Sequence, residues 1–451
     1  MNYIYITKKY WFIGLIVLIV ALNSIIFLPK YGFWTGATDP EYKEIALSLI
    51  DGDGFSLNGE KTMFREPAYP FLLFLNYKIF GVNDYSIRIL QFLFLFLICF
   101  LTYKITKKVF GSMEVKIATI FVALHPLFVI YATDISSEIL AILLLIFFVF
   151  IFVKDVDSES VLTPSLMGLA LALLVLTKSI FIFIPVFVVS FYLIKKKEKK
   201  IIKVVVFALS FLIIISPWVY RNYTNFGKIA VSERAGVVAY VHASKSELGK
   251  SDFIKYGISS LTSQYFVRLY EPGFNIFNIN IRPLNEKKKS LLGGGYSKDQ
   301  VDTLLFEESK RLWRERPFKN FIIGFFELAK ANAPTVPKDS IMFVYNIPEN
   351  VIGKIVFGLV IVALRLLWFA VILLSFFGIA KAIKLKNKYI FPLALPVVYL
   401  NLFIFFLEGV PRFLFPIYPL YFTFLAFTVV YFLEDKNIKF FKLKDNNGGA
   451  R

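Results

Sequence analysis

The chain has 451 residues, of which 57% are hydrophobic and only 18% are charged, and phenylalanine alone occurs 52 times. Soluble domains carry charges on about a quarter of their residues, and here the apolar residues stand in long blocks. The composition therefore excludes a soluble globular protein, a disordered chain and a nucleic-acid-binding domain. The net charge of +19 is explained by lysine-rich cytoplasmic loops of a membrane protein, since basic residues collect on the inner side.

Long apolar segments predict about ten membrane-spanning helices, because about 20 apolar residues are needed to cross a bilayer core of ~30 Å. We interpret the first as an uncleaved anchor, since no small-x-small cleavage site follows it. In chain order the predicted spans are 11–28, 86–103, 117–131, 135–153, 162–176, 180–194, 201–218, 351–380, 389–407 and 413–433.

Two further apolar segments predict helices that lie at the outer interface. The segment 67–80 is short and is interrupted by Asn76 and Lys78. The segment 318–331 is amphipathic and carries Lys319, among other charges. Counting it as a span would place the lysines at 381–388 outside, against the positive-inside rule.

Lysine clusters after residues 103, 194 and 380 and in the C-terminal tail place both termini in the cytoplasm. The loop 154–160 is acidic and gives this orientation no support. The sequence thus predicts an all-α polytopic membrane protein with a mixed extracytoplasmic loop domain. Residues 1–219 form an N-terminal transmembrane module with a first outer loop at 31–85, residues 220–350 form the outer region, and residues 351–451 form the C-terminal helices and tail.

The sequence has few of the residues that disulfides, histidine-based sites and nucleotide-binding loops require. Cys99 is the only cysteine, so no internal disulfide is possible. His125 and His242 are the only histidines, which leaves little for a histidine-based metal site or a Ser-His triad. The glycine run 293–295 lacks the strand and GxxxxGK[ST] context of a nucleotide loop and is interpreted as a flexible stretch.

Charges at membrane depth or in tight outer turns are costly and tend to be functional. The predicted topology collects nine of them on the outer side of the bundle, which suits a substrate with a charged head and an apolar tail. They are Asp39, Arg65, Glu66, Asp134, Glu138, Lys178, Arg221, Glu408 and Arg412.

Six short motifs surround these charges. They are Thr38-Asp39-Pro40-Glu41-Tyr42, Arg65-Glu66-Pro67-Ala68-Tyr69-Pro70, Ser136-Ser137-Glu138, Leu176-Thr177-Lys178, Ser216-Pro217-Trp218-Val219-Tyr220-Arg221-Asn222-Tyr223 with Phe226-Gly227, and Arg412-Phe413 with Pro416 and Pro419. In order and spacing they resemble the GT-C membrane glycosyltransferases. The nearest branch holds the protein O-mannosyltransferases and the lipid A aminoarabinose transferase. The resemblance covers nearly the whole chain, but the outer segment after Asn222 matches no pattern of that family.

The resemblance implies an enzyme of the prokaryotic plasma membrane that takes a sugar from a polyprenyl-phosphate carrier. The acceptor would be a lipid, a glycan or a protein on the extracytoplasmic face. The expected partners are these two substrates and membrane lipids, with no nucleic acid.

The resemblance also implies that Asp39 is the catalytic base of an inverting transfer. An acceptor hydroxyl must lose its proton as it attacks the anomeric carbon, and a carboxylate within hydrogen-bonding reach can accept that proton. The alternative role for Asp39 is to cap a helix that begins at Pro40, since Asp followed by Pro is a helix-start signal. The two roles are compatible.

The leaving group is a lipid phosphate, so the site requires fixed positive charge where negative charge develops. Lys178, in a short turn between two apolar segments, is the first candidate. Arg221, Arg412 and Arg65 are the others, since arginine grips a phosphate with two donors. Each of these side chains could instead anchor the end of a span at the interface.

Further acids and aromatic residues are candidates for metal binding or for contacts with the substrates. In some relatives, acids at the places of Glu66 and Glu138 help to hold a divalent cation, and no other cofactor is expected. Glu66 could instead pair with a cation, Glu138 could cap the helix that it begins, and Asp134 competes for the metal role. Tyr42 and Tyr69 could contact the sugar or the acceptor, as could Trp218, although Tyr and Trp are also common at membrane interfaces.

Two other functions stay open from the sequence. A flippase or transporter of lipid-linked sugars would also need many spans and a charged cavity. Such proteins commonly contain repeats and broken helices, and neither feature is clear in this sequence. An outer-face glycan polymerase or ligase would differ only in its acceptor, and a fold does not determine a substrate.

Overall fold

The computed structural model describes residues 39–194, 199–296, 298–332 and 351–435, together with Gly14, Ile16, Val20 and Ala21. Most of the predicted span 11–28, the lysines at 195–197 and the basic tail beyond Asp435 lie outside the described residues.

The described residues confirm an all-α membrane protein. Five helical segments are long and apolar enough to cross a bilayer, namely α4 (Asp84–Val109), α7 (Glu138–Val156), α10 (Lys200–Phe226), the part Gly358–Lys384 of α17 (Val351–Lys384), and the segment Pro411–Glu434. The last comprises α19 (Pro411–Leu414), η3 (Phe415–Ile417) and most of α20 (Tyr418–Asp435). Shorter apolar helices are α8 (Leu162–Thr177), η1 (Ser179–Phe181) with α9 (Ile184–Ile194), and α18 (Ile390–Phe405).

One predicted span is broken in the structure. The sequence predicts a single helix over 117–131, but α5 (Ser112–Leu124) and α6 (Pro126–Thr133) meet at an angle of 48°. Pro126 has no N–H to continue the helix and instead takes the first position of α6. The imidazole of His125 at the bend packs among Phe128, Trp368 and Tyr418.

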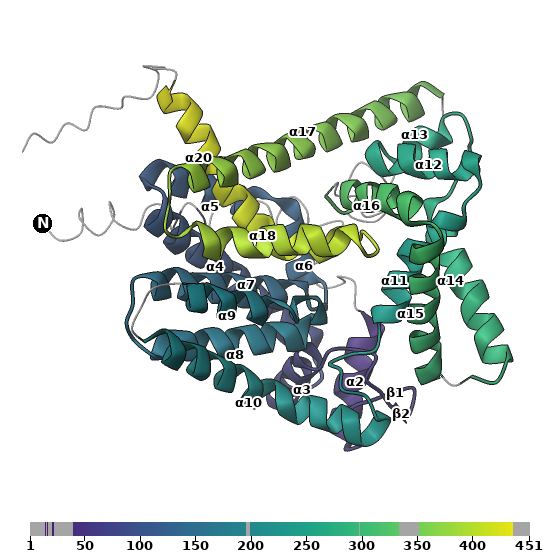
Figure 1. Cartoon of the computed structure of the whole chain (residues 1–451), viewed down its shortest axis with the longest axis horizontal. Helices are drawn as coiled ribbons and strands as arrows, with labels where there is room; N and C mark the ends of the chain where they lie inside the picture. Colours follow the sequence, from purple (N-terminus) through teal and green to yellow (C-terminus); the bar gives the residue numbers. More distant parts are fainter. Residues whose placement is uncertain are drawn as a thin grey trace, which may run out of the picture.

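The apolar helices form one bundle around a continuous hydrophobic core. Neighbouring pairs pack in the order α10 on α8, α8 on α7, α7 on α4, α4 on α5, α5 on α20 and α20 on α17. Figure 1 shows α7, α8, α10 and α18 running side by side along the length of the molecule. Phe148, Leu171, Leu400 and Phe424 are buried in this core.

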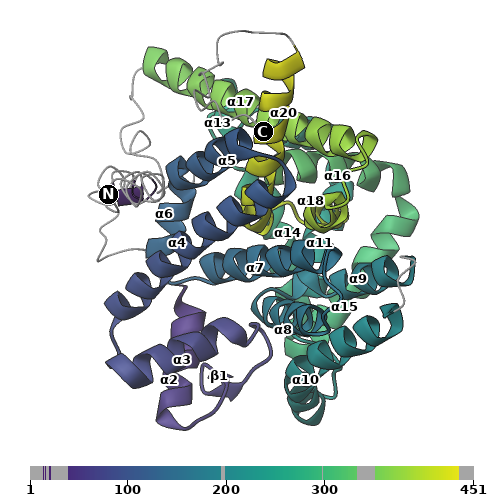
Figure 2. The ribbon, with the colours of Figure 1, turned by 90° about the vertical axis from the view of Figure 1, so that its left-hand side faces the viewer.

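The first outer loop folds into two helices and a small hairpin. Helix α2 (Pro40–Asp51) packs on α3 (Ala68–Phe80), the interfacial helix predicted at 67–80. Between them β1 (Ser56–Leu57) pairs antiparallel with β2 (Glu60–Lys61) through Asn58 and Gly59, which have φ values of 54° and 74°. Such positive angles are those that a type I′ turn requires. Figure 2 shows these elements beside the start of α4.

The described part of the outer region 220–350 is helical. It contains α11 (Ala235–Ser244), η2 (Lys245–Glu247), α12 (Lys250–Leu261), α13 (Gln264–Arg268), α14 (Ile276–Gly293), α15 (Lys298–Glu315) and α16 (Pro317–Asn332). Tyr240, Leu305 and Leu312 lie in its small hydrophobic core. Helix α16, predicted at the interface as 318–331, is not among the helices long and apolar enough to span.

A buried charge cluster fastens this outer region to the bundle. Lys245 and Lys330 lie 2.8 and 2.7 Å from the two carboxylate oxygens of Glu327, which is wholly buried. The main-chain N–H of Gly409, after α18, donates to the same carboxylate at 2.6 Å. A Cβ atom at Gly409 would lie 2.0 Å from the Glu327 carbonyl oxygen, so only glycine allows this approach. The turn between α18 and α19 is therefore held firmly against α16.

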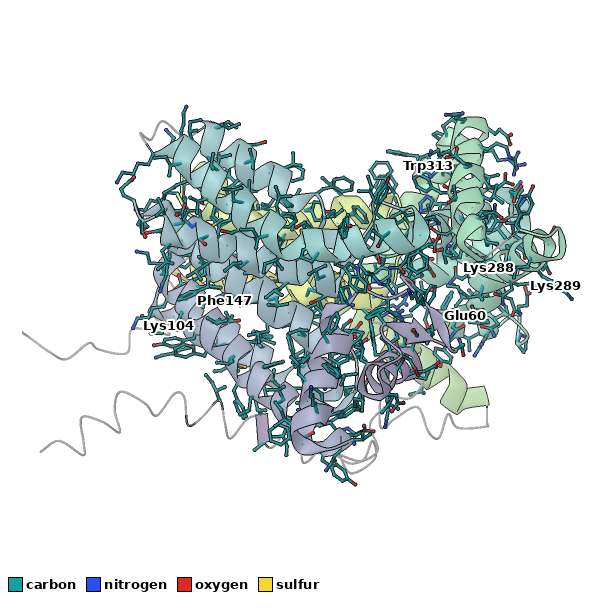
Figure 3. The ribbon with its side chains drawn as sticks, turned by 90° about the horizontal axis from the view of Figure 1, so that it is seen from below. Glu60, Lys104, Phe147, Lys288, Lys289 and Trp313 are labelled. Carbon is teal, nitrogen blue, oxygen red and sulfur yellow. The ribbon has the colours of Figure 1, made fainter. Side chains whose placement is uncertain are left out.

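The loops predicted to be cytoplasmic meet at one end of the bundle. The carboxylate of Asp157 lies 2.8 Å from Lys108, in the last turn of α4, and 2.7 Å from Lys388, which follows α17. The acidic loop 154–160 does not itself support the predicted orientation. Its Asp157 instead forms ion pairs with lysines of two neighbouring segments. Figure 3 shows Lys104 at one end of the molecule, and Glu60, Lys288 and Lys289 toward the other. Which end faces the cytoplasm stays a prediction.

Candidate active site

Asp39 stands at the start of α2 and joins two loops. Its side chain accepts the main-chain N–H of Glu41 at 3.3 Å, and thereby caps the helix that Pro40 begins. Its own main-chain N–H donates to the carbonyl of Ile135 at 3.1 Å, in the turn that precedes α7. The capping role expected from the sequence is therefore confirmed, and it fixes the position of the carboxylate.

Arg65 holds the other carboxylate oxygen of Asp39. One terminal nitrogen of its guanidinium lies 2.8 Å from Asp39 Oδ2, its Nε donates to Glu41, and its plane lies 4.6 Å from the ring centre of Tyr42. Burial opposes the charge, but the carboxylates of Asp39 and Glu41 raise the pKa of Arg65 above its usual value. The Asp39–Arg65 pair is thus a fixed, charged unit at the edge of the outer loop.

Glu66 ties this unit to two other segments. Its Oε1 accepts hydrogen bonds from the hydroxyls of Ser179 and Ser232, at 2.7 and 3.1 Å, and from the main-chain N–H of Ser179 at 3.2 Å. Burial alone would raise the pKa of Glu66, but the Ser179 hydrogen bonds and the nearby charge of Arg234 lower it. An ionised Glu66 thus holds the turn after α8 and the segment after α10 against the first loop.

Lys178 is bound by a buried acid. Its Nζ lies 2.9 Å from Oε1 of Glu138, and the two side chains are 11% and 5% exposed. Glu138 also interacts electrostatically with Arg412. The first residue of α7 is therefore a shared counter-ion for two of the cations that the sequence assigns to the donor phosphate.

Arg234 is a site residue that the sequence analysis missed. It lies within electrostatic range of Arg65, Glu66 and Arg412 and packs over the ring of Phe64 at 5.1 Å. Burial lowers the pKa of Arg234, and Arg65 and Arg412 lower it further. It belongs to the segment after Asn222 that matches no family pattern, so only its tertiary position reveals it.

Two of the predicted binding residues, Arg221 and Tyr69, lie away from the charge cluster. Arg221 donates to the carbonyls of Thr62 and Phe55 at 2.7 and 3.1 Å, and thus fastens the first loop to α10. Tyr69 is wholly buried, and its hydroxyl donates to Gln91 at 2.7 Å. Neither side chain joins the charge cluster of Asp39, and their roles in binding stay predictions.

Two further aromatic candidates are held by hydrogen bonds. The Tyr42 hydroxyl lies 3.1 Å from Ser137 Oγ, beneath the guanidinium of Arg65. The indole N–H of Trp218 donates to the carbonyl of Val231 at 2.8 Å. Only Tyr42 of these two belongs to the cluster around Asp39.

Glu66 and Glu138, which the sequence offers as ligands of a divalent cation, each bind other partners in this structure. Glu66 is satisfied by two hydroxyls, and Glu138 by an ammonium group. Within residues 39–194, 199–296, 298–332 and 351–435, no three His, Cys, Asp or Glu side chains lie close enough to share an ion. Positive charge at this site comes from Lys178 and from arginines.

Comparison with known proteins supports the predicted family resemblance. The family model described as dolichyl-phosphate-mannose-protein mannosyltransferase matches residues 65–220. This stretch holds four of the charged residues of the cluster, Arg65, Glu66, Glu138 and Lys178. No curated protein matches the sequence.

Solved structures share the fold at low sequence identity. The archaeal oligosaccharyltransferase AglB from Archaeoglobus fulgidus, in complex with an inhibitory peptide and a dolichol-phosphate, is 13% identical over 99% of this chain, with a TM-score of 0.55. That alignment spans 53% of the AglB chain, so this chain covers about half the length of its relative. The structural match confirms the predicted GT-C-like fold.

Two other structures show weaker similarity. The Archaeoglobus fulgidus oligosaccharyltransferase in complex with Zn and sulfate is 12% identical over 94% of this chain and 49% of its own, with a TM-score of 0.46. ArnT from Cupriavidus metallidurans bound to undecaprenyl phosphate is 13% identical over 90% of this chain and 78% of its own, with a TM-score of 0.40.

Proposed function

We propose that this protein is an inverting glycosyltransferase that moves a hexose or pentose from a polyprenyl-phosphate donor to an acceptor at the extracytoplasmic face of the plasma membrane. The observation that carries the proposal is the convergence of Asp39 with several cations at one end of an apolar bundle. The AglB structure named above contains a dolichol-phosphate, and the matched family model is that of enzymes named for a dolichyl-phosphate sugar. Both support a lipid-phosphate donor.

Asp39 is the proposed general base. The acceptor oxygen attacks the anomeric carbon while its proton passes to the carboxylate, and the bond from that carbon to the phosphate oxygen breaks. The electron pair of the broken bond leaves with the lipid phosphate. Arg65 and the Glu41 N–H fix the carboxylate and keep it from turning away from the acceptor.

Lys178, Arg412 and Arg234 are the proposed phosphate-binding residues. Developing charge on the leaving phosphate is stabilised by fixed cations that need no reorganisation during the reaction. Glu138 holds Lys178 beside Arg412, and Glu66 holds the segment that carries Arg234. Three cations from distant parts of the chain can therefore surround one phosphate, and no metal ion is required in this scheme.

The bend between α5 and α6 does not support the flippase alternative. Transporters place broken helices around a polar site at the membrane midplane. The break here packs His125 against Trp368, Tyr418 and Phe422. The charged side chains gather at the end of the bundle instead.

The function is tested with the purified full-length chain in detergent. The probes are undecaprenyl-phosphate and dolichyl-phosphate sugars with labelled mannose, glucose or arabinose, supplied with an envelope extract of the source organism. An enzyme forms labelled glycoconjugate without any membrane compartment, whereas a flippase does not. NMR of the product linkage then checks the inversion at the anomeric carbon. Absence of transfer from every donor, with the Asp39→Asn variant indistinguishable from the original protein, would overturn the proposal.

A further inference from the structure

A pocket outside the charge cluster lies against the turn between α18 and α19. It has a volume of about 220 Å³ and lies between α12, α13, α14 and, through Lys330, α16 of the outer region, together with α17 and the residues Glu408–Pro411. Pro411 lines the pocket, and the next residue, Arg412, interacts with Glu138 in the proposed active site. The pocket and the active site therefore share one short segment of chain.

An arginine in a membrane-spanning helix forms part of the pocket wall. Arg365 lies in α17, is 4% exposed, and donates through one terminal nitrogen to the carbonyls of Ser259 and Ser260, both at 3.1 Å. Its Nε is buried and has no hydrogen-bond partner among the described residues. A charge inside a spanning helix is costly, and such a residue is by default a candidate for function.

Two more residues of the wall carry buried polar atoms with no partner in the described part of the chain. These atoms are Ser259 Oγ and Asn280 Oδ1. Together with Arg365 Nε they comprise a charged donor, a hydroxyl and a carbonyl acceptor. A buried polar group without a partner is unfavourable, because it has lost its hydrogen bonds to water. Three such groups around one pocket indicate a ligand that supplies partners of both kinds.

The wall also limits the charge of the ligand. Two cations, Arg365 and Lys330, and one carboxylate, Glu408, line the pocket. Lys330 is already paired with Glu327 at 2.7 Å, so the charges of Arg365 and Glu408 balance one another. A neutral ligand therefore suits the wall better than a phosphate, whose ionised oxygens could donate nothing to the Asn280 carbonyl oxygen. A hydrocarbon chain would leave all these groups unpaired. Hydroxyl groups both donate and accept, so a polyhydroxylated ring satisfies the whole set, while Ile276 and Ile361 offer apolar contact.

We propose that this pocket is a binding subsite for one sugar ring of the acceptor, which makes the acceptor a glycan or a glycolipid. The pocket volume is that of a single ring, and the turn that lines it is rigidly fixed by the Gly409–Glu327 contact. The assignment of the ring to the acceptor rests on the proposed function. The assignment of the pocket as a sugar site rests only on the residues that line it.

The proposal is tested by saturation-transfer NMR on the full chain in detergent. The probes are the methyl glycosides of mannose, glucose, galactose and N-acetylglucosamine. At least one is expected to bind, and Asn280→Leu should weaken that binding about three- to tenfold, the effect of losing a hydrogen bond. Glu408→Gln should change the preference among the four sugars. Asn278→Leu is the matched control, since Asn278 is exposed on the same helix and does not line the pocket.

Three outcomes would overturn the subsite: no glycoside binds, binding is equal in Asn280→Leu and Asn278→Leu, or inorganic phosphate displaces the glycoside. The Asp39→Asn variant separates this proposal from the function. If glycosides bind to that variant and to the original protein but no transfer is ever detected, the sugar subsite is supported and the transferase proposal is wrong. If transfer occurs but no glycoside binds, only the subsite fails.

Discussion

The Nζ atom of Lys178 lies 2.9 Å from Oε1 of Glu138, although 40 positions separate the two residues in the chain. Both side chains are nearly buried, at 11% and 5% exposure. Breaking a buried ion pair by removing one partner costs about 3–5 kcal/mol, because a charge is left without compensation. We therefore expect Glu138→Gln to lower the melting temperature of the protein markedly.

The double variant Glu138→Gln/Lys178→Met should recover much of that stability, because neither charge then stays buried alone. It should not recover sugar transfer, since a proposed phosphate-binding cation is gone. The measurements are melting temperatures and transfer rates for the two single variants and the double variant. Additive losses of stability would contradict a direct pairing.

Replacement of Asp39 tests the proposed base. Asp39→Asn keeps the shape of the side chain but cannot accept a proton, so the transfer rate should fall about 10²- to 10⁴-fold. Glu41→Gln is the matched control, because Glu41 contacts the same arginine from the first turn of α2. Its rate should change far less. Equal effects of the two substitutions would show that the arginine contacts, and not the base, matter.

Arg234 tests the part of the site that only the structure reveals. Arg234→Gln should raise the KM for the lipid-phosphate donor about 10- to 100-fold, the usual effect of losing a hydrogen bond to a charged group. Arg282→Gln is the control, because Arg282 is 74% exposed on α14. Steady-state kinetics with varied donor measure the effect. An unchanged KM would remove Arg234 from the donor site.

His242 should make the stability of the outer region depend on pH. It is wholly buried and stacks on Trp313, and burial chiefly lowers its pKa from 6.5 to about 4. The neighbouring Glu327 acts in the opposite direction, and Lys245 acts with burial. The unfolded chain therefore binds the proton more tightly than the folded chain. The resulting stability is complete above pH 6.5 and is lost as the pH falls toward 4.

The loss over that interval should reach about 3 kcal/mol. Melting temperatures between pH 4.5 and 7 measure it, and His242→Phe, which keeps an aromatic ring against Trp313, should show a shallower profile. Identical profiles for the two proteins would assign the pH dependence to other groups.

The orientation in the membrane can be checked by cysteine labelling. The only native cysteine, Cys99, is 1% exposed and should not react. Lys104→Cys and Lys288→Cys place single thiols toward opposite ends of the molecule (Figure 3). In intact cells a membrane-impermeant maleimide should label only the cysteine at 288. Labelling of the cysteine at 104 would reverse the predicted topology.

The sequence by itself determined the class of protein and most of its helices. Spans are read from long apolar runs, because a bilayer imposes the same length and hydrophobicity on every helix that crosses it. The helices α4, α7, α8 and α10 lie where the hydropathy predicts them. The bend at His125 was not predicted, although Pro126 was visible as a local signal.

The charged motifs also indicated from the sequence which residues could gather, since Asp39 stands in the predicted first outer loop, and Lys178 and Arg412 stand in short predicted outer turns. Their pairing could not be predicted, because it depends on how helices far apart in the chain pack together. Only the tertiary structure separated Arg221, whose donors bind the backbone of the first loop, from the cations around Glu138. It also brought in Arg234, whose role leaves no local pattern. Hydropathy is local, whereas a charged site on a helical bundle is formed by contacts between distant segments.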